Sequence, residues 1–277
     1  MILEEHPYDP FINIALDESI LLVVEKRIVN KPILRIWRNS ESVVIGRNTN
    51  VFNEVRIDKL REYGVPLIRR ISGGGAVYHD LGNYNYTLVI PVNSRLSIDY
   101  IYEHFLKGIL LTLEALGVKG YIENYTDIVV NGFKVSGNSA IIRKNAILIH
   151  GTLLVDADLD ILCELLKPNT NLIEKKKCTP TKYKVANLSY LIDKELSPEI
   201  IIPNIINSFS KVLNAKPIIT MCNSTTLRIA ELLSKYKYKD PKWNWNKFED
   251  PNIWKEINSI INKMKNRKKG VCNLFNQ

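Results

Sequence analysis

The stretch from Arg69 to Asp80 contains three successive glycines behind two arginines, a composition suited to binding an anion. Gly73, Gly74 and Gly75 lack a Cβ, so the backbone can adopt a positive φ there and a ligand can lie directly on it. Backbone N–H groups beside fixed positive charge favour a phosphate or a carboxylate. A tight turn between strands explains the glycines more simply, because an isolated glycine-rich match has low specificity.

A β-hairpin predicted further along the chain carries a lysine and an aspartate. Asp127–Val130 and Phe133–Ser136 flank the dipeptide Asn131-Gly132, which is a strong signal for a two-residue turn. Regular pairing sets these residues opposite one another: Val130 and Phe133, Val129 and Lys134, Ile128 and Val135, Asp127 and Ser136. Alternation directs one set to the core and the other set to the opposite face: Ile128, Val130, Phe133 and Val135 against Asp127, Val129, Lys134 and Ser136.

Asp127 and Lys134 are therefore expected as diagonal neighbours on one face, roughly 7–8 Å apart at Cβ or a little less. As a surface ion pair they would contribute at most about 1 kcal/mol. As the lining of a common site they would supply a carboxylate and a positive charge. The small residues Gly137–Ala140 follow and would let a ligand approach the backbone. A lone strand histidine such as His150 is more often structural than catalytic, so these patterns leave both interpretations open.

Periodic patterns define the elements that must position these residues. Helical spacing predicts helices over 10–28, 53–63, 97–116, 158–166 and 197–213. Strand patterns cover 33–37, 42–46, 66–70, 76–78, 84–90, 140–143 and 146–155. The polar, lysine-rich stretch 167–190 is predicted to be a loop or a connection. Asp250-Pro251 predicts the start of a final helix, whose apolar stripe must pack against this chain or another one: Ile253, Ile257, Ile260, Ile261 and Met264.

Composition limits the classes of protein that this chain can belong to. Its 277 residues are 45% hydrophobic and 24% charged, which is typical of a globular protein. No apolar run reaches membrane-spanning length, the N-terminus lacks a signal-peptide pattern, and the four cysteines are far apart, so we expect a cytoplasmic protein. The net charge of +9 fits nucleic-acid binding, an acidic protein partner, or simply a solvated basic surface; it is concentrated in Lys175–Lys177, Lys182 and Lys184, Lys235–Lys242 and Lys263–Lys269.

Six motifs, taken in order, resemble the lipoate–protein ligase A family, a relative of the biotin ligases. They are Asn13–Glu18, Ser42–Arg47, Arg69–Asn83, Asp127–Gly137, His150–Leu154 and Trp243–Asn246. Each motif alone is weakly specific, but the ordered set, over residues 10–246, is highly specific. The resemblance implies an α+β (mixed α/β) catalytic domain of the biotin/lipoate ligase, class II synthetase-like type. Such a domain has a largely antiparallel mixed sheet flanked by helices.

The resemblance also implies a two-step reaction with ATP, Mg²⁺ and lipoate. Lipoate and ATP first form lipoyl-AMP and pyrophosphate, and the ε-amine of an acceptor lysine then attacks the acyl-adenylate and releases AMP. The acceptor would be a lipoyl domain or a glycine-cleavage carrier. No tightly bound prosthetic group, no membrane and no nucleic acid are expected to take part. The sequence leaves the choice between lipoate and octanoate open.

The family's residue roles are carried over to the matching positions of this chain. Lys134 matches the essential lysine and would contact both the acyl carbonyl and the phosphate. Lipoate and lipoyl-AMP would be bound by Arg70, Ser72, Gly73, Gly74, Gly75, Ala76, Ser136, Gly137, Ala140, His150 and Gly151. ATP would contact Val77, Tyr78, Asn83, Asp127 and Lys134, and Asp127 would also be the candidate Mg²⁺ ligand. An apolar slot for the lipoyl tail would be lined from the segment Val43–Arg47.

The chain departs from the family pattern in three places. Thr126 stands where an asparagine is usual, and the run Gly137–Ala140 is one residue longer than usual. Many members carry a small fused C-terminal domain after the tryptophan motif, whereas about thirty residues follow it here. We therefore expect a catalytic domain over 1–246, a basic amphipathic helix over 247–277 that is a candidate docking element, and a separate small subunit needed for adenylation.

Three other functions remain as alternatives. An ATP-independent octanoyl or lipoyl transferase uses a cysteine shortly before the lysine hairpin, and residues 1–162 contain no cysteine. Biotin ligation would need a loop richer in arginine than this one. A non-catalytic basic binding module is the rival from a different class. Release of pyrophosphate from ATP on addition of lipoate distinguishes the ligase from both the transferase and the binding module.

Overall fold

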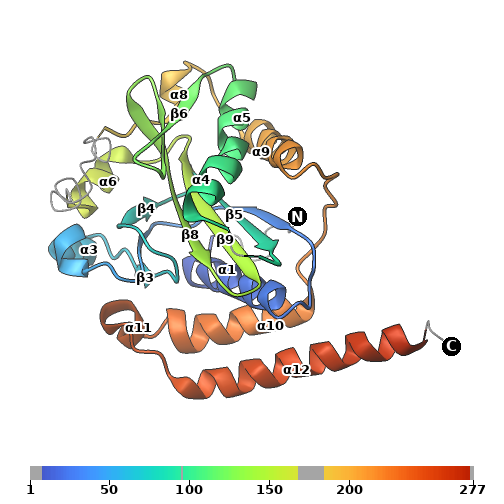
Figure 1. Cartoon of the computed structure of the whole chain (residues 1–277). Helices are drawn as coiled ribbons and strands as arrows, with labels where there is room; N and C mark the ends of the chain where they lie inside the picture. The colour runs from blue at the N-terminus through green and yellow to red at the C-terminus, as the bar shows by residue number, and fades with distance from the viewer. Residues whose placement is uncertain (1–7, 95, 168–183, 275–277) are drawn as a thin grey trace.

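Two β-sheets and the helices packed around them form the fold (Figure 1). The computed structural model describes residues 8–94, 96–167 and 184–274. Most of the predicted connection 167–190 lies outside the described residues, as do Lys175–Lys177 and Lys182. Two ends of this stretch are described: Leu166 forms a bridge with Val55, and helix α8 (Leu188–Leu191) follows the gap.

The larger sheet has six strands, and every neighbouring pair in it is antiparallel. In spatial order the strands are β1 (Ile33–Trp37), β5 (Asn83–Pro91), β9 (Ala146–Leu154), β8 (Phe133–Ile142), β7 (Asp127–Val130) and β6 (Gly120–Glu123). This arrangement confirms the predicted antiparallel sheet. Strand β6 was not predicted, because its residues are only half-buried and show no clear alternation.

The smaller sheet presents the glycine loop. Its order is β3 (Leu67–Arg69), β2 (Ser42–Ile45) and β4 (Val77–His79), with β2 parallel to β3 and antiparallel to β4. The glycines connect β3 to β4 and pass the C-terminal end of β2, which lies between these two strands. Three short helices contribute to the core of this sheet: α2 (Val51–Glu54), α3 (Ile57–Glu62) and α6 (Leu159–Leu165). The single helix predicted over 53–63 is wrong, because Val55 adopts an extended conformation and is fully buried.

Helices cover both faces of the large sheet. On one face lie α4 (Ile98–Phe105), α5 (Lys107–Ala115) and α9 (Pro198–Val212), which share an apolar core with the sheet. On the other face lies α1 (Pro10–Glu25), which is capped by the Asp9 carboxylate. Helix α1 is buried almost all round, since α10 (Ser224–Leu233) packs on its outer side. Within the described ranges, no helix is both long and apolar enough to cross a bilayer.

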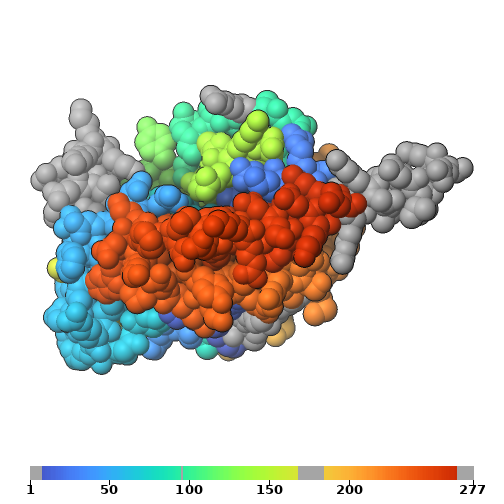
Figure 2. All heavy atoms as spheres, turned by 90° about the horizontal axis from the view of Figure 1, so that it is seen from below, coloured from blue at the N-terminus to red at the C-terminus, as the bar shows by residue number. Residues whose placement is uncertain are grey.

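The last helix is part of the same core. A π-helix, η2 (Ser234–Tyr238), and α11 (Pro241–Asn246) lead from α10 into α12 (Pro251–Leu274), which crosses the face seen in Figure 2. The predicted stripe packs mainly on α10, and Ile257 is fully buried. The apolar stripe is therefore covered by this chain and is not available for a partner.

The hairpin β7–β8 contains a β-bulge that the sequence analysis did not anticipate. Asn131 and Gly132 have positive φ as the predicted turn requires, and Lys134 pairs with Val129. The register then shifts, so Ile128 pairs with Ser136, not Val135, and Asp127 pairs with Gly137, not Ser136. A bulge inserts one unpaired residue into a strand, and no regular alternation predicts it.

Burial along the hairpin departs from the prediction at one residue. Ile128, Val130 and Val135 lie in the core as predicted, but Phe133 is 40% exposed. Val129 lies outside that core cluster, as its predicted face requires, and is fully buried because both faces of β7 are covered. The prediction for Phe133 is wrong, because the hairpin tip extends beyond the core.

We expect His79 to make the fold acid-sensitive. Burial, together with the charge of nearby Arg70, lowers the pKa of this histidine to about 3. The unfolded chain takes up a proton below about pH 6.5 while the folded chain does not. Stability should therefore fall between pH 6.5 and 3, by at most about 1.4 kcal/mol per pH unit from this group.

Urea unfolding at pH 7.5, 6 and 5 tests this expectation. His79→Gln should flatten the acid loss, whereas His104→Gln, in a partly buried ring stacked on Tyr100, should leave it unchanged. Identical pH slopes for the wild type and H79Q would contradict the assignment.

Candidate functional site

Arg70 holds the glycine loop from inside. The guanidinium is buried and donates hydrogen bonds to the carbonyls of Val44 at 3.1 Å, Gly73 at 2.6 Å and Gly75 at 3.0 Å, and to Ser72 Oγ at 3.1 Å. Burial lowers its pKa to about 10, so it stays positively charged at neutral pH. These hydrogen bonds give Arg70 the task of shaping the loop, and its predicted contact with an anion stays a prediction.

The loop backbone remains open to a ligand. Gly73 and Gly74 are exposed, and Gly74 has a φ of +87°, a conformation that favours glycine. The residues after β2 support the loop from below: Arg47 N–H donates to Ser72 O at 2.7 Å, and Thr49 Oγ1 donates to Gly74 O at 2.8 Å. The predicted lipoyl slot at Val43–Arg47 instead begins with side chains of the core, since Val43, Val44 and Ile45 are almost fully buried.

Glu54 closes the other end of the loop. Its buried carboxylate accepts a hydrogen bond from Ala76 N–H at 2.5 Å. Val77 is half-buried, and the Tyr78 side chain lies in the core of the small sheet. Tyr78 could therefore meet a ligand only through its backbone.

A buried polar chain connects the loop to helix α1. Ser72 Oγ lies 2.6 Å from His150 Nε2, and His150 Nδ1 lies 2.9 Å from Asp17 Oδ2. A carboxylate only accepts hydrogen bonds, so His150 Nδ1 carries a proton and donates a hydrogen bond to Asp17. Ser72 is 1% exposed and also accepts a hydrogen bond from Arg70. The hydrogen-bonded series Ser72–His150–Asp17 therefore supports the loop and does not act as a nucleophile with its general base.

Lys134 and Asp127 form an ion pair of 2.6 Å, with side chains 18% and 12% exposed. The bulge explains the contact, because it sets Gly137 opposite Asp127. A Cβ at Gly137 would lie only 3.1 Å from Lys134 Cε and Nζ, so the lysine side chain lies directly over this glycine. The predicted shared face of Lys134 and Asp127 is confirmed.

Strand β8 brings the lysine to the glycine loop. Ser139 Oγ donates to Gly73 O at 3.1 Å, and Ser139 is the cross-strand partner of His150. Gly137 N–H in turn lies 3.2 Å from Thr152 Oγ1 on β9. Lys134, Gly137, Ser139 and the loop thus line one side of the β8–β9 pair.

Other predicted residues are part of the supporting structure. The space beside Gly151 is occupied by a neighbouring side chain, since a Cβ there would lie 1.8 Å from Asn138 Oδ1. Ser136 is buried and accepts from Asn138 Nδ2 at 3.1 Å, and Ala140 N–H donates to Tyr102 Oη at 3.0 Å.

Asn83 lies on the face of the sheet that carries Thr152. It is two residues from Asn85, which pairs with Thr152. Asn83 is fully buried and donates to Asn85 Oδ1 at 3.1 Å. Asn83 Oδ1 and Asn85 Nδ2 have no hydrogen-bond partner among the described residues. These two atoms are unsatisfied polar groups close to the predicted site.

The acidic residues present suit only one type of metal binding. Among residues 8–94, 96–167 and 184–274, no group of three or more His, Cys, Asp or Glu side chains converges. Mg²⁺ commonly takes one or two carboxylates and completes its shell with water and substrate phosphates. Asp127 fits that pattern through the oxygen not paired with Lys134.

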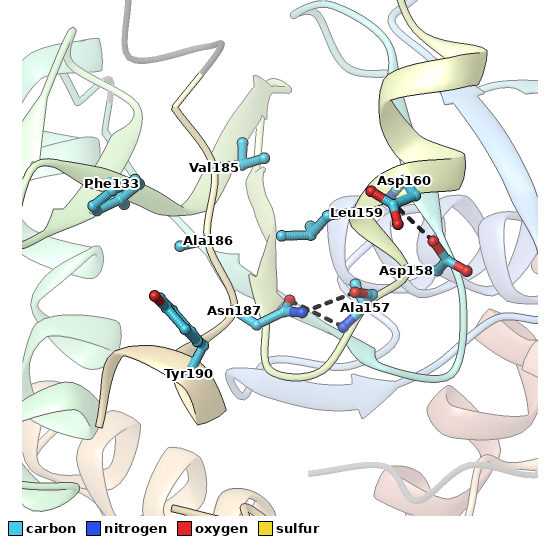
Figure 3. A pocket seen from close by; sticks show the side chains of 9 residues that line it. All are labelled: Phe133, Ala157, Asp158, Leu159, Asp160, Val185, Ala186, Asn187 and Tyr190. Atoms are coloured by element: carbon cyan, nitrogen blue, oxygen red, sulfur yellow. Dashed lines mark hydrogen bonds between the residues drawn. The ribbon is translucent and has the colours of Figure 1, made fainter. Parts of the chain in front are cut away.

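A pocket separate from the glycine loop lies outside the hairpin (Figure 3). It has a volume of about 470 Å³, and none of the predicted site residues lines it. Phe133 and the 81% exposed Tyr190 lie at its rim, and Asp158 and Asp160 at the end of the pocket away from Phe133. The segment that adjoins this pocket holds the backbone of Lys134, because Lys134 N–H donates to Lys184 O at 2.7 Å.

Sequence reasoning missed four residues that contact the loop or hold its partners. They are Asp17, Glu54, Ser139 and Asn244. Asp17 and Glu18 offered one signal, since two adjacent acids in an otherwise apolar helix indicate buried polar partners. Glu54, Ser139 and Asn244 offered none, because their contacts depend on segments distant in sequence.

Comparison with known proteins gives a consistent result. Residues 9–210 match the family model of the lipoyl protein ligase A/B catalytic domain. A provisionally named lipoate-protein ligase A from Aeropyrum pernix is 40% identical over 196 residues, which cover 71% of this chain and 73% of the relative.

Solved structures agree. The bipartite lipoate protein ligase of Thermoplasma acidophilum, studied with its E2 lipoyl domain, is 28% identical with a TM-score of 0.77 over 90% of this chain and 96% of that one. A lipoate-protein ligase A bound with ATP is 29% identical with a TM-score of 0.78, over 89% and 98%.

Replacing Gly151 by alanine should destabilise the fold by about 1–3 kcal/mol, because the added methyl overlaps Asn138 and forces the core to shift. Gly73→Ala is the matched control, since nothing lies within 4 Å of its Cβ position. Urea denaturation measures both. Equal stability of G151A and the wild type would show that β8 and β9 are looser than the contact implies.

Proposed function

We propose a reaction for this chain from the fact that it belongs to the lipoyl protein ligase A/B catalytic-domain family. The chain activates lipoate with ATP to lipoyl-AMP and pyrophosphate. It then transfers the lipoyl group to the ε-amine of a specific lysine on an acceptor protein. The names of the A. pernix relative and of the ATP-bound ligase structure support this reaction.

One observation carries the proposal: strand β8 carries Lys134 and also contacts the glycine loop through Ser139. The first step brings a carboxylate against an anionic α-phosphate, so fixed positive charge must lie between them. Lys134 Nζ is held by Asp127, and its strand contacts Gly73 through Ser139. A strand that carries an ammonium and contacts an exposed glycine backbone fits the needs of this step.

The roles of the other residues follow from their contacts. Arg70 and Ser72 keep Gly73, Gly74, Gly75 and Ala76 in a shape along which the acyl-adenylate lies. His150 fixes Ser72 from below, while Gly137 leaves room for the lysine amine. Val77 and Tyr78 offer backbone to adenine, and Asn83 with Asn85 offers polar atoms to the nucleotide. Ser136, Ala140 and Gly151 act indirectly, by holding β8 against β9.

ATP brings Mg²⁺ to the site as its counterion. Asp127 would hold the ion together with the phosphates, and the ion would neutralise charge on the leaving pyrophosphate. The lysine amine then remains directed at the acyl carbonyl and the α-phosphate oxygens.

The second step needs no nucleophile from this chain. The acyl group is already activated as an adenylate, so positioning and charge stabilisation suffice for attack by the acceptor amine. The described cysteines are poorly suited to a thioester route: Cys163 lies exposed on α6 and Cys222 lies buried before α10. We therefore favour the ligase over the cysteine-dependent transferase. Reduced cysteines and the use of ATP suit a cytoplasmic protein.

Membership of the family also suggests the protein partners of this chain. We propose a lipoyl domain as the acceptor and a separate small subunit that supports adenylation. The bipartite T. acidophilum ligase and its lipoyl domain support both proposals. Because the apolar stripe of α12 is already covered, a docked subunit would use the outer faces of the 247–277 segment and not that stripe.

Lys134→Ala should reduce lipoate-dependent pyrophosphate release by about 10²–10³-fold, or about 3–4 kcal/mol, because it removes the charge that stabilises the transition state. Unfolding by urea shows whether the protein still folds. The double variant Lys134→Ala/Asp127→Asn removes the stranded carboxylate as well, and should remain equally inactive. Near-normal ligation by either variant would show that Lys134 forms only a structural ion pair and takes no part in the reaction.

Adenylation should depend on the second subunit. We expect this chain alone to release pyrophosphate slowly with lipoate and ATP, and a small lipoyl-ligase subunit from the same source to restore the rate. Octanoate in place of lipoate, measured in parallel, tests the acyl preference. Full activity of the isolated chain would rule out the two-subunit proposal and leave the ligase assignment intact.

A further inference from the structure

We propose that Trp243 and Asn244, on helix α11, are positioning residues that set the shape of the glycine loop through Arg69. This inference deepens the proposed function and rests on it, because the loop is taken to hold the acyl-adenylate. Neither residue lies within the matched catalytic-domain segment, which ends at residue 210.

Helix α11 binds the edge of the small sheet as an extra strand would. Strand β3 is the outermost strand, so one edge of its backbone lacks a strand partner. At Arg69 both groups are taken by α11: Arg69 N–H donates to Asn244 Oδ1 at 2.9 Å, and Arg69 O accepts from Trp243 Nε1 at 2.7 Å. Both contacts are buried, which makes them costly to leave unsatisfied.

The Arg69 side chain extends this contact to the support of the loop. Its Nε donates to Asn244 O at 3.0 Å, and its Nη1 lies 2.9–3.1 Å from the carbonyls of Gly46, Arg47 and Thr49. These residues are the ones that carry the loop. A Cβ on Gly46 would overlap Gly74 O at 2.0 Å, so the two backbones are in close contact. Movement of Arg69 must therefore displace the loop.

Trp243 and Asn244, which together with their hydrogen bonds to Arg69 we call the clamp, are themselves anchored on helix α1. Asn244 Nδ2 donates to Tyr238 O at 2.7 Å, and Tyr238 Oη donates to Glu18 Oε2 at 2.6 Å. Lys237 Nζ contacts both oxygens of Glu18 at 2.9 Å and lies 4.3 Å from the Trp243 ring centroid. Glu18 adjoins Asp17, which orients His150 under Ser72. Neighbouring residues of α1 thus fix the loop from two sides.

The clamp has a specific consequence for activity. Loss of the indole N–H leaves Arg69 O buried and unpaired, so β3 and the 46–49 segment shift or loosen. The loop would then bind its ligand less well while Lys134, on the other sheet, stays in place. The expected result is a raised KM for lipoate with a smaller change in kcat.

Trp243→Phe is the test, with Trp245→Phe as the matched control on the same helix. Trp245 contacts Phe52, and its N–H makes no hydrogen bond with Arg69. In W243F we expect hydrogen–deuterium exchange of the peptide over residues 70–76 to be about five- to tenfold faster, and the KM for lipoate to rise by a similar factor. W245F should change neither value.

Two further variants separate positioning from folding. Asn244→Asp keeps the acceptor for Arg69 N–H but loses the donor to Tyr238 O, so it should retain part of the loop protection, whereas Asn244→Ala should lose it at a temperature where urea unfolding shows both folded. If W243F and W245F show the same loop exchange and the same KM, the clamp is wrong. The exchange result decides the clamp even if the wild type releases no pyrophosphate in the presence of the small subunit, an outcome that would overturn the proposed function instead.

Discussion

The buried guanidinium of Arg70 is the interaction on which the site depends. A run of glycines has more conformational freedom than any other backbone, so an open loop of this kind collapses unless something fixes it. Arg70 draws the carbonyls of Gly73 and Gly75 inward. In a trans peptide the following N–H points the opposite way, so the N–H of Gly74 faces away from the arginine. A positive charge buried behind the exposed backbone of Gly73 and Gly74 is thus produced by the same four hydrogen bonds that hold the loop.

The cost of burying that charge explains the polar residues around it. Arg70 is desolvated, and the surrounding carbonyls, Ser72 and nearby Glu54 replace the lost water. Ser72 is in turn fixed by His150 and Asp17, while Glu18, the next residue, holds the π-helix through Lys237. Helix α1 therefore carries two buried acids, in a position between sheet and α10 where an apolar helix would be the simpler solution. Asp17 also pairs with the buried Arg35 of β1 at 3.2 Å, so the two acids connect α1 to the large sheet as well as to the loop and its clamp.

The hairpin shows how far sequence patterns reach. The turn, both strands and the shared face of Lys134 and Asp127 follow from local rules, and the structure agrees. The predicted partners of Asp127 and Ile128 fail at one bulge, and that bulge is what allows the ion pair. It replaces Ser136 by Gly137 opposite Asp127, and the missing Cβ gives the end of the lysine side chain more room there.

The sequence by itself determined most of the strands and several of the longer helices, the antiparallel sheet, the family and the two segments that line the site. Each depends on local backbone preference or on ordered motifs, which a single chain displays directly. Only the tertiary structure decided that Arg70 faces inward, that the Tyr78 side chain belongs to the core, and that the stripe of α12 is covered by α10. It also decided that Trp243 and Asn244 complete the edge of β3. These contacts join residues up to 175 positions apart, and their partners are fixed by packing in three dimensions, which no periodicity along the chain encodes.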